Sequence, residues 1–331
     1  MRYIITLVAT ATPALAEVPR VVTDIPPVHA LVAQVMGDLG QPELLLAKGA
    51  DEHDFQLKPS QAGAVADSDL VIWIGPELTP WLDGAMDSRA EGAAALALLD
   101  AEGTQRRAYG DAKTDAHGHG EDHADEAGHS EHEGHADEAG HSEAEHAEEA
   151  GHEEGHDHGS EDPHAWLDPA NAQVWLGLIA AELGRLDPEN GTTYAANAVA
   201  AGERIAALDG ELVALLAPAK DKPIVTFHDA YGYFVDHYGL TVAGSIALGD
   251  ASSPGAARLA ELRGELEAGG VVCIFPEVQH DPALVEQITE GTGVKIGGAL
   301  DPVGSSLEAG PDAYAALLRG MAQTIADCAG G

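Results

Sequence analysis

Short apolar segments alternate with longer helical segments in both halves of the chain, and this alternation limits the possible folds more than any other feature of the sequence. The segments predicted as strands are residues 20–25, 43–46, 70–74, 224–227, 241–247, 271–275 and 294–296. The segments predicted as helices after residue 170 include 171–186, 254–267, 282–290 and 311–326. Strands and helices that alternate in this way form parallel sheets covered by helices. We therefore predict an α/β fold with two Rossmann-like lobes.

One further predicted helix is long enough to connect the two lobes. It should begin near Thr192 or Thr193 as N-cap and continue until Pro218 stops it. At about 1.5 Å per residue, this helix is more than about 30 Å long. We expect an N-terminal lobe over residues 17–186, a bridging helix over 187–218 and a C-terminal lobe over 219–331. Ligands of open α/β sheets bind beyond the carboxyl ends of the strands, so we expect the binding site at the interface of the lobes.

The first sixteen residues have the pattern of a secretory signal peptide. Met1-Arg2 precede the apolar stretch 3–15, and Ala14-Leu15-Ala16 is a small-residue cleavage site. An uncleaved anchor is the alternative, but an apolar run of this length is too short to span a bilayer. No lipobox cysteine follows the run. We expect cleavage before Glu17, a mature chain of 315 residues that carries no lipid, and a location in the periplasm.

Residues 117–158 contain eleven of the seventeen histidines, together with many acidic residues and neither Lys nor Arg. We predict a disordered loop over residues 115–161, because this composition cannot bury enough apolar surface to offset chain entropy. The tract contains a duplication, since residues 124–131 (ADEAGHSE) recur at 136–143. Imidazoles and carboxylates in a flexible run can collect transition metals, and the tract can equally be a solvated spacer. The two interpretations are compatible.

The net charge of the chain is −40, and eighteen of the acidic residues lie between positions 115 and 162. The rest of the chain is therefore still strongly acidic. Such a charge excludes nucleic acids and anionic membrane surfaces as partners.

The chain has two cysteines, Cys273 in the apolar run 271–275 and Cys328 near the C-terminus. In an oxidising compartment, two cysteines predict a disulfide. This bond would join the C-terminal helix to a core strand.

Three histidines occupy positions at the ends of strands or in loops where the predicted lobes meet. His53 follows the strand at 43–46, His164 lies where the first lobe ends, and His228 follows the strand at 224–227. A single histidine in such a place is more often a structural residue than a metal ligand. Three that converge on one interface favour a metal site.

The sequence resembles the periplasmic zinc-binding proteins of high-affinity zinc ABC transporters, the ZnuA-like members of the cluster A-I solute-binding family. The resemblance covers essentially the mature chain. It depends on six segments: 49–59 (GADEHDFQLKP), 75–82 (GPELTPWL), 162–169 (DPHAWLDP), 227–234 (FHDAYGYF), 275–279 (FPEVQ) and 300–304 (LDPVG). A His/Asp-rich insertion before the second of the histidine motifs is typical of the zinc-specific branch.

The resemblance implies that His53, His164 and His228 bind the metal, with the fourth position left open between Asp301, Glu52 and water. It also implies a receptor that captures Zn²⁺ and delivers it to an ABC permease, and we expect this receptor to be a monomer. The residues favour zinc independently, because three imidazoles with at most one carboxylate suit tetrahedral zinc, whereas manganese prefers more oxygen ligands.

Three alternative functions remain open at this point. A receptor for manganese or another divalent metal is the alternative within the same family. A zinc hydrolase would also use three histidines and an open position, but the chain contains no H-E-x-x-H, G-x-S-x-G or phosphate-loop motif, and we predict that it is not an enzyme. An extracellular zinc buffer or adhesin would act through the histidine-rich tract alone.

A ligating imidazole needs an acceptor for its second N–H group. We expect Asp229, Glu77 and Glu277 to supply such acceptors. The remaining three histidines outside the tract, His29, His237 and His280, are predicted to be structural or exposed.

Overall fold

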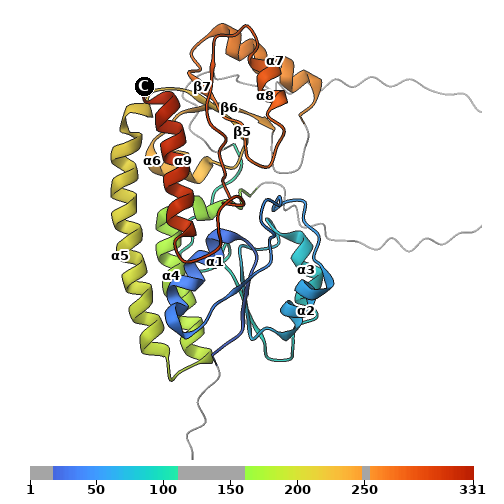
Figure 1. The fold of residues 1–331 in the computed structure, drawn as a ribbon, viewed down its shortest axis with the longest axis vertical. Helices are drawn as coiled ribbons and strands as arrows, with labels where there is room; N and C mark the ends of the chain where they lie inside the picture. The colour runs from blue at the N-terminus through green and yellow to red at the C-terminus, as the bar shows by residue number, and fades with distance from the viewer. Residues whose placement is uncertain (1–17, 111–160, 248–253) are drawn as a thin grey trace, which may run out of the picture.

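The computed structural model describes residues 18–110, 161–247 and 254–331. The predicted signal peptide, the histidine-rich part of the tract and the short segment 248–253 lie outside these residues. The described chain forms two parallel four-stranded sheets, one in each half of the sequence (Figure 1). The predicted α/β fold with two lobes is confirmed.

The first sheet has the strand order β2-β1-β3-β4. Its strands are β1 (Val21–Thr23), β2 (Glu43–Leu44), β3 (Leu70–Trp73) and β4 (Ala94–Ala97). The sequence analysis missed β4, whose sequence is AALA, because alanine is depleted in strands. The helices α1 (Pro26–Met36), α2 (Pro59–Asp67) and α3 (Pro80–Met86) connect the strands.

The second sheet repeats this arrangement with the order β6-β5-β7-β8. Its strands are β5 (Ile224–His228), β6 (Val242–Ala247), β7 (Cys273–Ile274) and β8 (Lys295–Ile296). The helices of this half are α6 (Gly232–Tyr238), α7 (Ala256–Ala268), α8 (Ala283–Thr289) and α9 (Ala313–Ala329). In both sheets the first strand has neighbours on both sides, so the chain reverses its direction of winding beside β1 and beside β5. Ligands of open α/β sheets bind at such reversals.

Alternate residues of each central strand enter different hydrophobic cores. Val21 of β1 and Ile224 of β5 belong to one large core that extends through both halves. Their neighbours Val22 and Val225 point to the opposite faces, where each sheet packs on its own helices. This alternation follows from the two-residue period of side chains along a strand.

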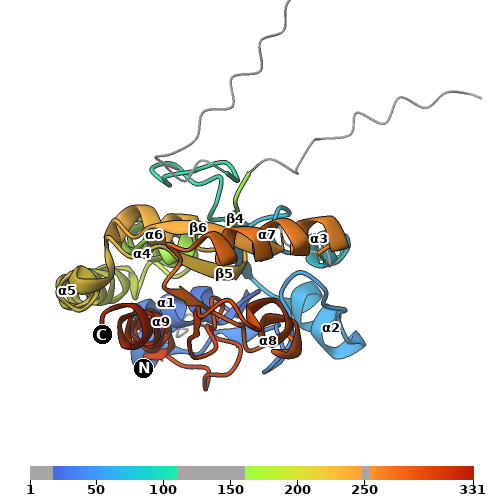
Figure 2. The same ribbon diagram turned by 90° about the horizontal axis from the view of Figure 1, so that it is seen from above.

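The large core is covered by four helices that belong to both halves of the chain. These are α1, α4 (Pro169–Leu186), α5 (Gly191–Leu216) and α9. Figure 1 shows α5 running along most of the length of the molecule, and Figure 2 shows these helices gathered on one side of it. The helix α5 begins slightly earlier than predicted: Asn190 is its N-cap, and Asp187 accepts hydrogen bonds from Asn190 Nδ2 at 2.7 Å and Tyr194 Oη at 2.9 Å.

The predicted disulfide is confirmed. Cys273 of β7 is bonded to Cys328 of α9, with a Cα–Cα distance of 6.3 Å. The bond fixes the C-terminal helix, which also packs on α1 and α5, to the core of the second sheet.

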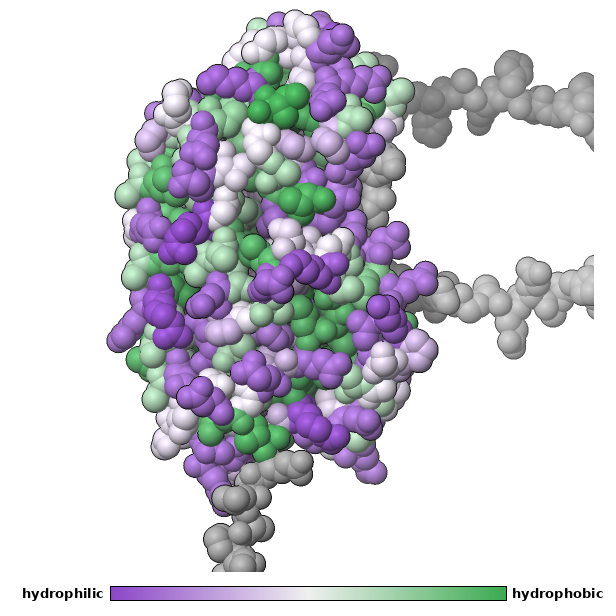
Figure 3. Space-filling view, in the orientation of Figure 1, coloured by the Kyte–Doolittle hydropathy of each residue, from purple (hydrophilic) through white to green (hydrophobic). Residues whose placement is uncertain are grey.

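In the described part of the chain, the helices are too short or too polar to cross a bilayer. On the face drawn in Figure 3, hydrophobic residues are interspersed with hydrophilic ones. Among the residues that the structure describes, the exposed large hydrophobic side chains are Val199, Val213, Val278 and Ile296.

His237 of α6 joins the second half to α4 and α5, two of the helices that cover the large core. Its Nδ1 lies 2.9 Å from Asp168 Oδ1 at the start of α4, and its Nε2 lies 2.8 Å from Asp209 Oδ1 on α5. The hydrogen bond to Asp168 raises the pKa of His237, burial opposes the shift, and Asp209 adds to it. His237 is therefore structural, as expected.

We predict that His237→Gln lowers the free energy of unfolding by about 1 kcal/mol in weakly acidic solution, since this ion pair is partly screened by solvent. The folded-state pKa lies above the unfolded value of about 6.5, so the folded state binds the proton more tightly. The contribution is thus complete below pH 6.5 and disappears as the pH rises through the folded pKa. Urea unfolding of both proteins at several pH values measures it, and a constant difference up to high pH would refute this explanation.

Candidate metal centre

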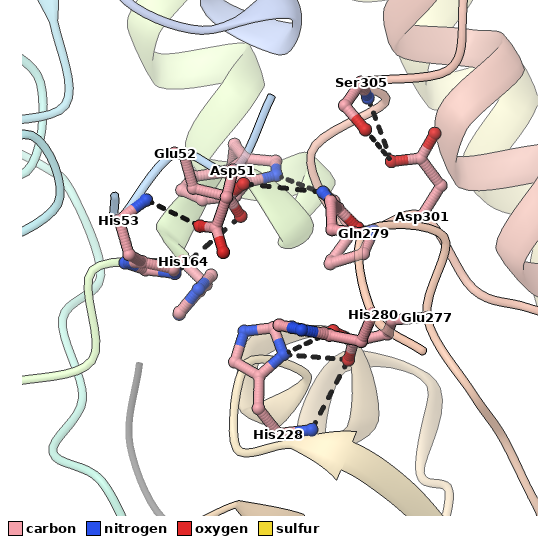
Figure 4. A network of polar contacts seen from close by, with 12 residues as sticks. Asp51, Glu52, His53, His164, His228, Glu277, Gln279, His280, Asp301 and Ser305 are labelled. Atoms are coloured by element: carbon pink, nitrogen blue, oxygen red, sulfur yellow. Dashed lines mark hydrogen bonds and ion pairs between the residues drawn. The ribbon is translucent and has the colours of Figure 1, made fainter. Parts of the chain in front are cut away.

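His53, His164 and His228 come from three distant segments of the chain and meet between the two halves of the molecule. The ring centroids of His53 and His164 are 5.4 Å apart, those of His53 and His228 5.8 Å, and those of His164 and His228 5.4 Å. One nitrogen of each ring lies within 4.8 Å of the other two. Figure 4 shows the three side chains close to one another.

His53 lies in the loop between β2 and α2, and the loop is held from both halves. Gly49 has a φ of +77°, which favours glycine, and its N–H donates to Ser305 O at 2.9 Å in the second half. The His53 N–H donates to Asp51 Oδ1 at 2.9 Å in a local turn. Trp81 Nε1 donates to Glu52 O at 2.7 Å. These bonds position the backbone that carries His53.

His164 is fully buried just before the short 3-10 helix Ala165–Leu167. Its Nδ1 lies 2.9 Å from Asp162 Oδ1, and its backbone N–H donates to the same oxygen at 3.0 Å. Because a carboxylate can only accept here, the contact favours the tautomer with the proton on Nδ1. This tautomer leaves the lone pair on Nε2, the nitrogen available to a metal.

Asp162 is in turn held by Arg107, and the two side chains are almost completely buried. Arg107 Nη1 lies 3.1 Å from Asp162 Oδ2. Tyr233 Oη donates to Asp162 O at 3.0 Å and accepts from the Arg107 N–H at 3.1 Å. The guanidinium lies against Gly232, where an added Cβ would be 0.9 Å from Arg107 Nη1. Arg107 thus connects the segment that carries His164 to the helix that follows His228.

His228 is the last residue of the central strand β5. Its Nδ1 lies 2.8 Å from Glu277 Oε1 and 2.7 Å from Oε2, and Tyr231 Oη donates to Glu277 Oε1 at 2.8 Å. His228 Nε2 is buried and has no hydrogen-bond partner among the described residues. Burial alone would lower the pKa of His228, but the Glu277 carboxylate raises it; burial would likewise raise the pKa of Glu277, but His228 lowers it.

The prediction that Glu277 accepts from a histidine of the site is confirmed by this contact. Asp162, which has the same role for His164, was not among the expected acceptors. The signal for it was present in the motif, because Asp162 precedes His164 by two residues and such a spacing allows a local side-chain hydrogen bond. The roles expected for Asp229 and Glu77 stay predictions.

Two carboxylates were considered for the fourth position, and their surroundings differ. Glu52 is buried, and its Oε1 lies 3.7 Å from His53 Nε2. Burial raises the pKa of Glu52 to about 8. Asp301 instead accepts from the Ser305 and Ser306 N–H groups at 2.9 Å each, one on each oxygen. In Figure 4 its carboxylate points to this turn, away from the three histidines.

The remaining histidines of the described chain behave in different ways. His29 is buried, and its Nε2 lies 3.1 Å from Pro42 O. His280, expected to be structural or exposed, is partly exposed, but it also lies beside the site and forms a second group of possible ligands with His228 and Glu277. The eleven histidines of the tract lie outside the described residues.

The site can hold a metal ion with nitrogen ligands. Three imidazoles from three distant segments, two of them oriented by carboxylates, form a donor set suited to zinc. A nearby carboxyl group whose pKa is raised by burial would be ionised more easily once a cation is present.

The sequence matches known proteins over almost its whole length. Residues 21–328 match the family model described as the periplasmic zinc-uptake complex component A. The chain is 57% identical over 320 residues to the high-affinity zinc uptake system protein ZnuA of Paracoccus denitrificans, covering 97% of this chain and 94% of that protein. It is 41% identical over 309 residues to the protein of the same name from Brucella abortus, covering 93% and 91%.

Among solved structures, the fold is similar to that of the solute-binding protein FpvC from Pseudomonas aeruginosa in complex with Mn²⁺. The TM-score is 0.72 and the identity 22%, with 94% of this chain and 98% of that chain covered. A zinc-bound deletion mutant of ZnuA gives a TM-score of 0.69 at 22% identity, with 95% and 99% covered. At this level of identity the similarity concerns the fold.

Proposed function

Because the chain belongs to the periplasmic zinc-uptake component A family, we propose that His53, His164 and His228 are the ligands of the Zn²⁺ that it captures. The protein is the zinc-binding receptor of a zinc uptake system, and its ABC permease is the partner that receives the ion. The observation that supports the ligand set best is the meeting of three imidazole rings from distant segments, with centroids 5.4 to 5.8 Å apart.

We propose Glu52 rather than Asp301 as the protein's contribution to the fourth position. Glu52 is close to His53, whereas both oxygens of Asp301 already accept backbone hydrogen bonds. A neutral Glu52 in the empty site would lose its proton when a cation arrives, because the ion offsets the cost of a buried negative charge.

Zinc is the cargo that this donor set favours over manganese. Three imidazole nitrogens and one carboxylate suit a tetrahedral zinc site at about 2.0 to 2.1 Å, whereas manganese is better served by oxygen ligands. The ion is transported, so the site must also release it.

Release should involve local movements rather than a wide opening of the lobes. We propose lobes at residues 17–186 and 219–331 joined by the helical segment 187–218. The shared core and the packing of α9 on α1 and α5 support small displacements, because a packed helix layer resists bending. The loop that carries His53 is the segment that we expect to move.

The protein acts, in this proposal, as a monomer in the periplasm after removal of residues 1–16, and it has no catalytic role. A hydrolase would need a carboxylate free to activate water at the metal. Glu277 instead contacts His228 and Tyr231, so its carboxylate is not free to act as a base for water.

The proposal is tested by changing all eleven histidines of the tract to glutamine in the full-length chain, a protein that we call the Gln-tract variant. We expect calorimetry to retain one tight zinc site, since its ligands lie outside the tract, while any additional weak binding decreases. Loss of nearly all zinc binding would instead favour the buffer or adhesin function.

A further inference from the structure

His280, Glu277 and His228 form a second set of possible metal ligands next to the three-histidine site. One ligand atom of each lies within 4.8 Å of the other two. His280 Nε2 is 3.6 Å from Glu277 Oε2, and Glu277 in turn contacts His228 Nδ1 at 2.7 Å. Figure 4 shows His228, Glu277 and His280 together at the end of β5.

The His280 ring is held in place by stacking, and among the described residues its nitrogens form no hydrogen bond. It stacks on Phe227 with centroids 4.1 Å apart and an interplanar angle of 12°. The His280 backbone N–H donates to Glu277 O at 3.3 Å, which closes a tight turn between the two residues. Phe227 and His228 are consecutive, so the stack keeps His280 beside the strand end that carries the shared ligand.

The chemistry of this set suits a transition-metal ion. Two imidazoles and one carboxylate are a common set of protein ligands for zinc, and the remaining position can be filled by water. Ligand atoms around tetrahedral zinc lie about 3.3 Å apart at normal bond lengths. The 3.6 Å between His280 Nε2 and Glu277 Oε2 is close to that spacing.

Exposure to solvent differs between the two sets. The side chain of His280 is 33% exposed, whereas those of His228 and Glu277 are 6% and 1% exposed. His164 is fully buried. The second set therefore lies on the solvent side of His228, and the three-histidine site lies on its inner side.

We propose that His280, Glu277 and His228 form an outer station through which Zn²⁺ enters and leaves the three-histidine site. The inference rests on the proposed function of that inner site. The two positions share His228, and two divalent ions so close together would repel each other strongly. The ion therefore occupies one position at a time, and His228 is a ligand in both positions.

The outer station is detected by removing the inner site. The Gln-tract variant with His53→Ala and His164→Ala should keep one weak site for Zn²⁺ or Co²⁺, measured by calorimetry and by the absorption of bound Co²⁺. This site should disappear on adding His280→Phe, which preserves a ring to stack on Phe227 but has no nitrogen ligand. Absence of binding before that change, or its persistence after it, would overturn the outer station.

Its role in exchange is tested with the inner site intact. An intermediate binding position lowers the activation barrier for zinc entry and exit but does not change the free energies of the zinc-free and zinc-bound proteins. His280→Phe in the Gln-tract variant should therefore slow zinc uptake and chelator-driven release equally, by about tenfold, at constant Kd. His237→Gln, which changes a histidine outside both sets, should leave the rates unchanged.

The outcomes separate the two proposals. Failure of the Gln-tract variant itself to bind zinc tightly would refute the proposed function. Tight binding with parental exchange rates in His280→Phe would refute the outer station alone.

Discussion

Replacing His164 by alanine is expected to lower the affinity for Zn²⁺ by more than about 100-fold. Loss of a residue that only supports a ligand typically costs about 10- to 100-fold in metal affinity, and loss of the ligand itself should cost more. His164 is fully buried, so neither bulk water nor a neighbouring surface residue can easily replace its nitrogen. Competition with a chelator of known affinity, in the Gln-tract variant, measures the change.

Two matched variants make this result specific. Asp162→Asn keeps the side-chain size but weakens the contact with His164 Nδ1, so the affinity should fall by the smaller factor of about 10 to 100. His237→Gln should leave the affinity unchanged, because His237 contacts Asp168 and Asp209 rather than the site. Retention of parental affinity in His164→Ala would exclude this residue as a ligand.

Loss of the disulfide is expected to have the largest effect on stability. Cys273 and Cys328 are separated by 55 residues, and in the chain-entropy model closing a loop of this length is worth about 4 kcal/mol. Reduction should therefore lower the free energy of unfolding by about that amount and release α9 from β7. Urea unfolding with and without reductant measures it.

The double variant Cys273→Ser and Cys328→Ser provides the control. Its unfolding midpoint should equal that of the reduced protein and should not respond to reductant. The bond lies outside the three-histidine site, so zinc affinity under native conditions should change little. Equal stabilities of the oxidised and reduced proteins would show that the bond does not constrain the unfolded chain.

Much of the fold was predictable because several strands are rich in valine and isoleucine and the longer helices, such as α4, α5 and α9, are periodic. The strand β4 was not, since its sequence AALA has no such preference and becomes a strand only through pairing with β3. The start of α5 was misplaced because Thr192 or Thr193 was taken as its N-cap, whereas Asn190 holds that position and contacts Asp187 in the α4–α5 turn.

The site was predictable to the extent that its residues occur in local motifs at strand ends. The contact of Arg107 with Asp162 spans 55 residues of sequence, so no local pattern indicates it. The choice between Glu52 and Asp301 depended on the serines that bind Asp301, which a pattern of residue types does not show. His280 was predicted to be structural or exposed, and its place beside the site was missed because its stacking on Phe227 depends on how two strand ends pack.

The central claim is that one Zn²⁺ is bound by histidines from three distant segments. Anomalous scattering at the zinc absorption edge, from crystals of the zinc-loaded full-length protein, tests it most directly. We predict one strong peak between His53, His164 and His228, with nitrogen ligands at about 2.0 to 2.1 Å and an oxygen in the fourth position. A peak only at other residues, or three imidazole rings too far apart to share one ion, would contradict the account.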